Sequence, residues 1–376
     1  MSESIGLFAI TLFMLITVFF TGYFLQETSR KGVFFGVRVP AEYMGSEEVK
    51  SILRRYKKNF LISFIIYALI YLALMCMYPN PGVMIIGIFA FIIVLNVNYY
   101  KTHKEVKLLK GRENWVKDSK NVVIVDTEFR KNKDKKMVVS KWWFIIPVVL
   151  IILNVIIALV RYPNLPDVLP RHWNGKGVVD GWSNKSYLLV LALPIVETLL
   201  TGIMFGMYTA IGRAKQDLDS ENIEASKERS RRFRRFWSAF AAGMACFIAA
   251  DFTMLQLNTL AILKTSPTFM IVSYVFEFGI VIVVVIGSLL IGQGGSRIKV
   301  IENKNGEKIA INRDDDKYWK LGDFYYNPDD PALFVEKRVG IGWDFNYARP
   351  AAKIIMGFIA ILIIGVIVLA IAMITK

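Results

Sequence analysis

The chain has 376 residues, of which 55% are hydrophobic, and a formal net charge of +15. This hydrophobic content excludes an ordinary soluble domain and indicates a polytopic membrane protein. The positive charge alone does not indicate nucleic-acid binding, because basic residues also gather in the cytoplasmic loops of membrane proteins.

Eight apolar segments are long enough to cross a bilayer core, which takes about 20 helical residues. We therefore expect an all-α polytopic integral membrane protein with helices at residues 5–25, 60–78, 82–100, 143–160, 187–211, 236–260, 269–292 and 351–375. The first segment lacks a preceding basic residue, so we interpret it as a retained helix and not as a signal peptide. Cys76 and Cys246 lie within spans and imply no disulfide.

Basic residues alternate between the loops. Of the 46 Lys and Arg residues, 40 lie in residues 26–59, 101–142, 212–235 and 293–353. The positive-inside rule places these stretches in the cytoplasm, where they also attract anionic membrane lipids. Both termini and the loop at residues 161–186 should then lie outside a plasma membrane.

The chain divides into six consecutive segments by composition. They are three helices with an inner loop (1–100), a basic inner loop (101–142), two helices around the outer loop 161–186 (143–211), a second basic inner loop with two helices (212–292), an inner aromatic domain (293–350) and a last helix (351–376).

Two inner stretches look structured. Ser46 is positioned to cap a short helix whose first turn holds Glu47 and Glu48. The Asn305-Gly306 pair between strand-like runs indicates a hairpin, so we expect a small β-containing cytoplasmic appendage.

This domain has an acidic run at residues 314–316 and an acidic pair at 329–330. We interpret both as exposed turns, which are commoner than divalent-ion sites. Candidate docking residues for a cytoplasmic regulator or a membrane protein are Gly36, Arg38, Pro40, Trp319, Tyr325, Tyr326, Arg338, Trp343 and Arg349.

The outer loop contains "LPRHWNGKGVVDGWSNKS", residues 169–186, with one of the chain's two histidines. A zinc site needs several converging ligands, and His172, Asp167 and Asp180 are too few. A hydrolytic triad fails because His103 is expected on the other side of the membrane. We therefore expect no metal, no cofactor, no catalytic residue and no enzyme activity.

Two interpretations of this loop remain. Trp173 and Trp182 are either headgroup anchors or apolar contacts for a ligand, whose charge Arg171, Lys176, Asp180 and Lys185 would complement. His172 would make such binding sensitive to mild acid. The candidate ligand-binding residues are Pro170, Arg171, His172, Trp173, Asn174, Gly177, Asp180, Gly181, Trp182 and Lys185.

Three carboxylates lie inside expected spans: Glu197, Asp251 and Glu277. Each costs about 2.5–3.5 kcal/mol at a helix centre on insertion scales, so each should face protein or water. Their similar expected depth allows one acidic layer below the outer loop. That layer is either a proton- or cation-linked pocket or a set of structural pairs.

The outer loop resembles the signature P-x-H-[FW]-[ND]-x-x-G-x-x-D-[GR]-[FYW]-x-[SN]-K of bacterial membrane proteins related to SdpI. "GVRVP" is similar to a Gly-x-Arg-x-Pro turn of such proteins, and the aromatic stretch 318–350 resembles an uncharacterised domain of larger relatives. The resemblance implies a Gram-positive envelope protein. In the best-understood relative it implies immunity to a secreted peptide toxin and sequestration of a cytoplasmic repressor.

The favoured hypothesis is thus a plasma-membrane protein that binds or senses an extracytoplasmic ligand, as in immunity to, or signalling of, a secreted antimicrobial peptide. One alternative is an ion- or proton-coupled secondary transporter that uses the intramembrane carboxylates. The other is a membrane scaffold or assembly partner that acts through its cytoplasmic loops. Direct nucleic-acid binding is not expected.

Overall fold

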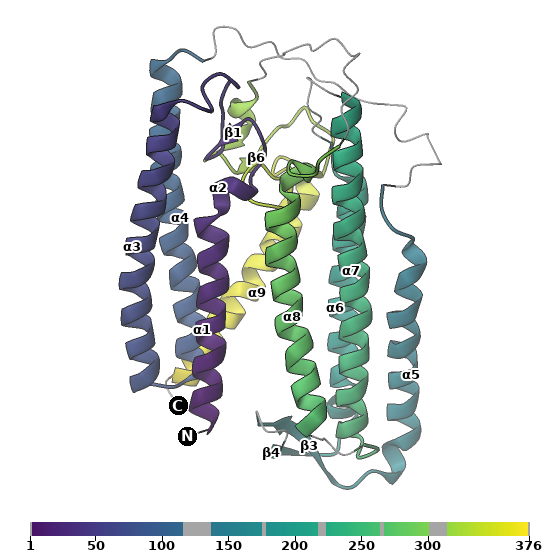
Figure 1. The fold of residues 1–376 in the computed structure, drawn as a ribbon. Coiled ribbons are helices and arrows are strands. Elements are labelled where there is room, and N and C mark those ends of the chain that lie inside the picture. Colours follow the sequence, from purple (N-terminus) through teal and green to yellow (C-terminus); the bar gives the residue numbers. More distant parts are fainter. Residues whose placement is uncertain are drawn as a thin grey trace. The chain divides into compact units, whose positions relative to one another are not determined.

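The computed structural model describes residues 2–115, 137–174, 178–216, 223–263, 267–300 and 314–374. Within these residues, eight helices are long and apolar enough to cross a membrane, as the sequence predicts. They are α1 (Ser2–Tyr23), α3 (Glu47–Met77), α4 (Pro81–Arg112), α5 (Ile145–Arg161), α6 (Tyr187–Arg213), α7 (Ile223–Thr259), α8 (Pro267–Ile291) and α9 (Pro350–Ile374) (Figure 1).

The remaining elements are short. They are α2 (Leu25–Thr28), the 3-10 turns η1 (Lys141–Phe144), η2 (Tyr162–Asn164), η3 (Gln293–Gly295) and η4 (Asp316–Tyr318), and the antiparallel strand pairs β1 (Val33–Phe34) with β2 (Val37–Arg38), β3 (Val168–Trp173) with β4 (Val179–Asn184), β5 (Trp319–Lys320) with β6 (Phe324–Tyr325), and β7 (Phe334–Glu336) with β8 (Trp343–Phe345). The hairpin expected at Asn305-Gly306 lies outside the described residues.

Two spanning helices begin well before their apolar segments. Ser46 caps α3 as predicted, because its Oγ accepts a hydrogen bond from the Val49 backbone N–H at 3.3 Å. The prediction of a short separate helix after Ser46 is wrong, because α3 continues unbroken to Met77. α7 likewise begins at Ile223, ahead of the expected residue 236. Lys, Arg and Glu are good helix formers, so a helix can continue beyond the apolar stretch that marks the span.

The structure divides into two compact units. The first contains residues 1–132, 214–230 and 284–376, and the second contains residues 133–213 and 231–283. The inner aromatic domain therefore belongs to the same unit as the N-terminal helices, although about half of the chain separates them.

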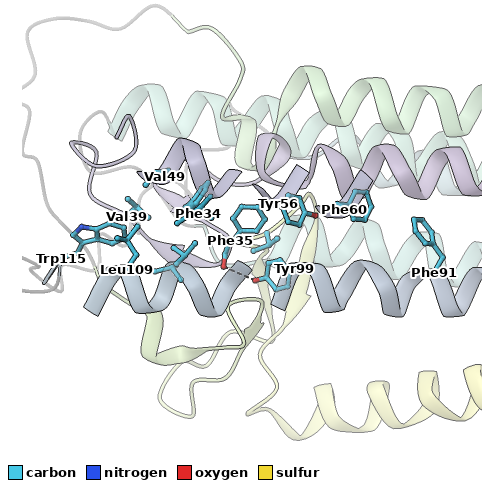
Figure 2. Close-up of a cluster of buried hydrophobic side chains, with 14 of the residues drawn as sticks. Phe34, Phe35, Val39, Val49, Tyr56, Phe60, Phe91, Tyr99, Leu109 and Trp115 are labelled. Atoms are coloured by element: carbon cyan, nitrogen blue, oxygen red, sulfur yellow. Dashed lines mark hydrogen bonds between the residues drawn. The ribbon is translucent and has the colours of Figure 1, made fainter. Parts of the chain in front are cut away.

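The core of the first unit is aromatic (Figure 2). Tyr56 and Phe60 of α3 stack with ring centroids 5.9 Å apart, and Phe60 contacts Phe91 of α4 at 6.2 Å. α1 fits against this ladder at Gly22, whose carbonyl accepts a hydrogen bond from the Tyr56 hydroxyl at 2.8 Å. A Cβ on Gly22 would lie 2.5 Å from the Phe60 ring, so the close approach of α1 requires glycine.

The hairpin formed by β1 and β2 is buried against the same core. Phe35 and Gly36 form its turn with positive φ angles of 45° and 80°, the conformation of a tight two-residue hairpin. The Phe35 side chain is fully buried, with its ring centroid 4.6 Å from that of Tyr56. The "GVRVP" stretch is thus part of the folded core of this unit.

In the second unit, α5 and α6 are joined by the hairpin of β3 and β4. Leu169 of β3 is fully buried among Ala158 of α5, Val190 of α6 and Leu260, the residue directly after α7. Its cross-strand partner is Ser183. The hairpin therefore packs one apolar side chain against the ends of three helices.

Pro194 interrupts the hydrogen bonds of α6. Proline has no N–H, so the Val190 carbonyl four residues earlier loses its helical partner. The Gln256 side chain of α7 donates to that carbonyl instead, with Nε2 at 2.8 Å. This contact connects α6 with α7 about two turns from Glu197.

Leu169→Ala should lower the free energy of unfolding by about 2–5 kcal/mol, because it opens a cavity where three helix ends meet. Chemical denaturation of the purified protein in detergent would measure this change. Val168→Ala is the matched control, since Val168 is 46% exposed and should change stability little. Equal effects of the two substitutions would contradict the packing of Leu169 against the helix ends.

Candidate functional site

The signature residues of the outer loop lie on the β3–β4 hairpin. Residues 175–177, including Gly177, lie outside the described part of the chain. The hairpin is closed just before them by Asn174. Its backbone N–H donates to the Val178 carbonyl at 2.9 Å, and its Oδ1 accepts from the Val178 N–H at 3.1 Å. Asn174 therefore holds the facing ends of β3 and β4 together.

Lys185 holds the base of the hairpin. Its ammonium donates to the Leu165 carbonyl at 2.9 Å and lies 5.4 Å from the centroid of the Tyr162 ring. Its backbone N–H donates to the Asp167 carbonyl at 2.7 Å. The structure thus gives this signature lysine internal partners at both its side chain and its backbone.

His172 and Asp180 face each other across the two strands, with Nδ1 hydrogen-bonded to a carboxylate oxygen. The His172 side chain is 68% exposed, so this pair lies on the surface. Gly181 is opposite His172, and a Cβ there would lie 2.8 Å from the His172 Cβ. The glycine of the signature therefore makes room for the histidine, and Asp180 orients its ring.

The hairpin also exposes apolar and basic side chains. Along β4 the exposed residues alternate, with Asp180 and Trp182 on the solvent-facing side. Trp182 is 59% exposed and Val178 58%, and Arg171 is exposed beside them. Pro170 and Trp173 are partly buried. We define the exposed surface of the hairpin as Arg171, His172, Val178, Asp180 and Trp182.

The intramembrane carboxylates take different partners. Glu197 accepts a hydrogen bond from the Asn154 amide at 2.9 Å, whereas Asp251 accepts one from the Ser273 hydroxyl at 2.9 Å. Glu277 lies close enough to Asp251 for their carboxyl groups to interact electrostatically. Asn154 also donates to Thr253 at 2.9 Å, and Thr253 is about 200° around α7 from Asp251. The structure thus groups Asp251 with Glu277 and places Glu197 in a separate contact.

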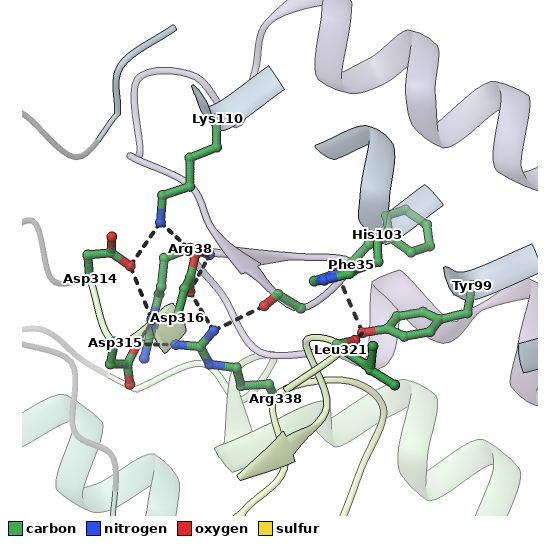
Figure 3. Close-up of polar contacts among 11 residues, drawn as sticks. Phe35, Arg38, Tyr99, His103, Lys110, Asp314, Asp315, Asp316, Leu321 and Arg338 are labelled. Atoms are coloured by element: carbon green, nitrogen blue, oxygen red, sulfur yellow. Dashed lines mark hydrogen bonds and ion pairs between the residues drawn. The ribbon is translucent and has the colours of Figure 1, made fainter. Parts of the chain in front are cut away.

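A cluster of charged side chains joins the β1–β2 hairpin to the inner aromatic domain (Figure 3). Arg338, with a side chain only 1% exposed, is paired with Asp315 and with Asp316, the latter at 2.5 Å. Arg38 contacts Asp315 at 3.1 Å. Lys110 at the end of α4 lies 2.5 Å from Asp316 and also pairs with the neighbouring Asp314. We call these six residues the inner charge cluster.

The charges in this cluster neutralise one another. Burial lowers the pKa of Arg338, and the carboxylates of Asp315 and Asp316 act against that shift. The guanidinium keeps its proton because its intrinsic pKa is far above neutral pH. Arg338 also donates to the Gly36 carbonyl at 3.0 Å, so the cluster fixes the backbone of the "GVRVP" turn.

Two glycines bring the turn and the domain together. A Cβ on Gly36 would lie 2.5 Å from the Gly322 carbonyl oxygen. A Cβ on Gly322 would lie 2.6 Å from the His103 ring of α4. His103 Nδ1 in turn donates to the Phe35 carbonyl at 2.8 Å. His103 is therefore a packing residue of this inner interface.

A second buried carboxylate, Asp330, organises the rest of the aromatic domain. It accepts hydrogen bonds from Lys215 at 2.6 Å, Tyr325 at 2.8 Å and the Ala332 N–H at 3.0 Å. Burial would raise the pKa of Asp330, but these donors outweigh it and hold the pKa below its usual range. The Arg349 guanidinium donates to the Asp330 backbone carbonyl at 2.8 Å.

Asp323 shows the opposite balance. Burial holds its pKa above the usual range, although the Lys337 ammonium lies 3.8 Å away and favours the ionised form.

The expectation that the acidic stretches form exposed turns is wrong for Asp315 and Asp330, which are 8% and 7% exposed. Sequence reasoning did not predict their pairing with Arg338 and Lys215, although the unbroken run of three aspartates was a usable signal.

Most of the expected docking residues are used inside the unit. Gly36, Pro40, Trp319, Tyr325 and Arg338 are buried. Arg38, Trp343 and Arg349 are partly buried, and Tyr326 is 40% exposed. In the described part of the chain, no group of three or more His, Cys, Asp or Glu side chains is placed to hold a metal ion.

Arg338→Ala should destabilise the protein by about 3–5 kcal/mol, because it leaves Asp315 and Asp316 buried without their main counter-charge. Arg54→Ala is the control, since Arg54 pairs with Glu47 at the surface, both with side chains over 70% exposed. Thermal unfolding in detergent would compare the two variants. Equal midpoints for Arg338→Ala and the unmodified protein would show that the inner charge cluster does not support the fold.

Two families match parts of the chain. A domain of unknown function (DUF1648) matches residues 149–198, from α5 through the hairpin to Glu197. A family of unknown function (DUF5808) matches residues 328–353, which include Asp330, Arg338 and Arg349. No curated protein and no solved structure matches the chain significantly. The chain thus resembles DUF1648 over its outer hairpin and DUF5808 over its inner aromatic domain.

Proposed function

We propose that this multi-pass membrane protein recognises an extracytoplasmic ligand through the exposed surface of the hairpin, and that the ligand is a secreted, membrane-active peptide. The proposal rests on one observation: some hairpin residues anchor it to the helices, and others stay exposed. Leu169 and Lys185 hold it from beneath, while Trp182, Val178 and Arg171 remain exposed. A rigid base with an exposed aromatic side chain is suited to binding.

The composition of this surface favours a peptide over a small polar solute. Trp182 and Val178 offer apolar area, and Arg171 and the His172–Asp180 pair offer charges of both signs. A two-stranded sheet also presents unpaired backbone donors and acceptors along its outer edges, to which an extended peptide can add as a strand.

The resemblance of the signature to SdpI-related proteins supports immunity to, or signalling of, a secreted antimicrobial peptide in a Gram-positive bacterium. The distribution of basic residues supports a plasma-membrane orientation with the hairpin and both termini outside. Under this proposal, inner partners meet the basic loops and the exposed Leu321, Phe324 and Tyr326.

The scaffold alternative receives less support from the inner residues, because most of them are used in contacts within their own unit. The transporter alternative is favoured by one observation, the buried contact of Glu197 with Asn154 inside the span.

Cells that carry this protein should survive secreted peptides of related bacteria better than cells without it, and Trp182→Ala with Arg171→Ala should abolish that difference. Both side chains are exposed, so the double variant should reach the membrane in normal amounts. Killing curves together with membrane abundance would measure the effect.

Trp142→Ala is the matched control, since Trp142 is 67% exposed but lies in η1, before α5. It should leave protection unchanged. Protection that survives the double hairpin variant, or is lost equally with Trp142→Ala, would contradict recognition by the hairpin.

A further inference from the structure

The side chains around Glu197 form a buried polar site between three helices of the second unit. Glu197 of α6 and Asn154 of α5 are both 0% exposed. The Asn154 amide nitrogen donates to Glu197 Oε2 and to the Thr253 hydroxyl oxygen of α7, each at 2.9 Å. The Thr253 hydroxyl donates in turn to the Ala249 carbonyl at 2.7 Å.

The hydrogens of Asn154 Nδ2 and of the Thr253 hydroxyl are all used in these hydrogen bonds. An amide nitrogen has two N–H groups, and a threonine hydroxyl has one hydrogen. Two acceptors remain, because Glu197 Oε1 and Asn154 Oδ1 have no hydrogen-bond partner among the described residues. Leaving a buried polar atom unpaired costs about 1–3 kcal/mol. The site therefore has two unpaired acceptor oxygens and no unused donor hydrogen.

The apolar stretches of α5, α6 and α7 around Glu197 contain no Lys or Arg that could balance its charge. Glu197 is the only charged residue in 187–212, residues 145–160 contain none, and Asp251 is the only one in 236–259. Asp251 is bound to Ser273, and Glu277 of α8 carries the same sign of charge. An ionised Glu197 would be a buried carboxylate with one amide donor, which costs several kcal/mol even after relaxation.

We propose that Glu197 and Asn154 form an intramembrane proton-binding site. The bound proton is on Glu197 Oε1 and is donated to Asn154 Oδ1, while Asn154 Nδ2 donates to Glu197 Oε2. One proton thereby satisfies both unpaired oxygens in a two-bond acid–amide pair. On release the O–H electrons stay on Oε1 and the proton passes to water, which leaves an uncompensated charge among α5, α6 and α7.

The surroundings of the site connect proton release to helix packing. Pro194 interrupts α6 three residues before Glu197, and Gln256 replaces its missing hydrogen bond. The Thr201 hydroxyl, one turn further along α6, is buried and has no partner in the described part of the chain. A charged Glu197 would therefore draw water or a new donor to this break in the helix. The inference is independent of ligand binding by the hairpin.

Infrared difference spectroscopy of the full-length protein in nanodiscs tests the site. The unmodified protein at neutral pH should show the carbonyl stretch of a protonated carboxyl group, and Glu197→Gln should lose that band. Asn154→Leu should keep the band but shift it to higher frequency, because the carbonyl loses its amide donor. Glu105→Gln, at the exposed ion pair with Arg55, is the control and should leave the band unchanged.

An unchanged band in Glu197→Gln would show that Glu197 is ionised and overturn the proposal. A band that sodium or potassium removes at constant pH would also overturn it, because the site would then hold an alkali ion. Glu197→Gln supplies an amide in place of the O–H donor, so its thermal midpoint should match that of the unmodified protein at neutral pH. A large loss of stability in that variant would count against the acid–amide pair.

Discussion

The fold depends on local neutralisation of charge that has been taken out of water. An isolated buried ion costs far more than any single packing contact returns, so each buried ionic group needs a partner at hydrogen-bond distance. Arg338 meets this requirement with Asp315 and Asp316, and Asp330 meets it with Lys215 and Tyr325. These contacts determine which segments of the first unit can pack together.

The inner charge cluster and the hairpin differ in how their side chains are used. The inner charge cluster closes on itself, with Arg338 and Gly36 joining the aromatic domain to the "GVRVP" turn. The hairpin uses one buried leucine and one lysine to hold its base, whereas Arg171, Val178 and Trp182 stay exposed. This difference is the reason for assigning recognition to the hairpin and support of the fold to the inner domain.

Some of this arrangement could be predicted from local sequence. The eight apolar segments and the Ser46 cap depend on neighbouring residues alone, and both are found in the structure. The pairing of Arg38 with Asp315 joins residues 277 positions apart, and no local pattern announces it. For the same reason local sequence predicts an exposed turn for the acidic run. The Asn154–Glu197 contact was missed because a single asparagine in an apolar helix has no periodicity.

We propose an orientation in which the hairpin lies outside the membrane and the inner charge cluster on its cytoplasmic side. It can be tested most directly by labelling single cysteines with a membrane-impermeant maleimide, after Cys76 and Cys246 are replaced by serine. Val178→Cys, on the hairpin, should react in intact cells. Leu108 of α4, near Lys110, is 77% exposed, and Leu108→Cys should react only after the membrane is opened. The reverse pattern would contradict the orientation and, with it, recognition of an external ligand by the hairpin.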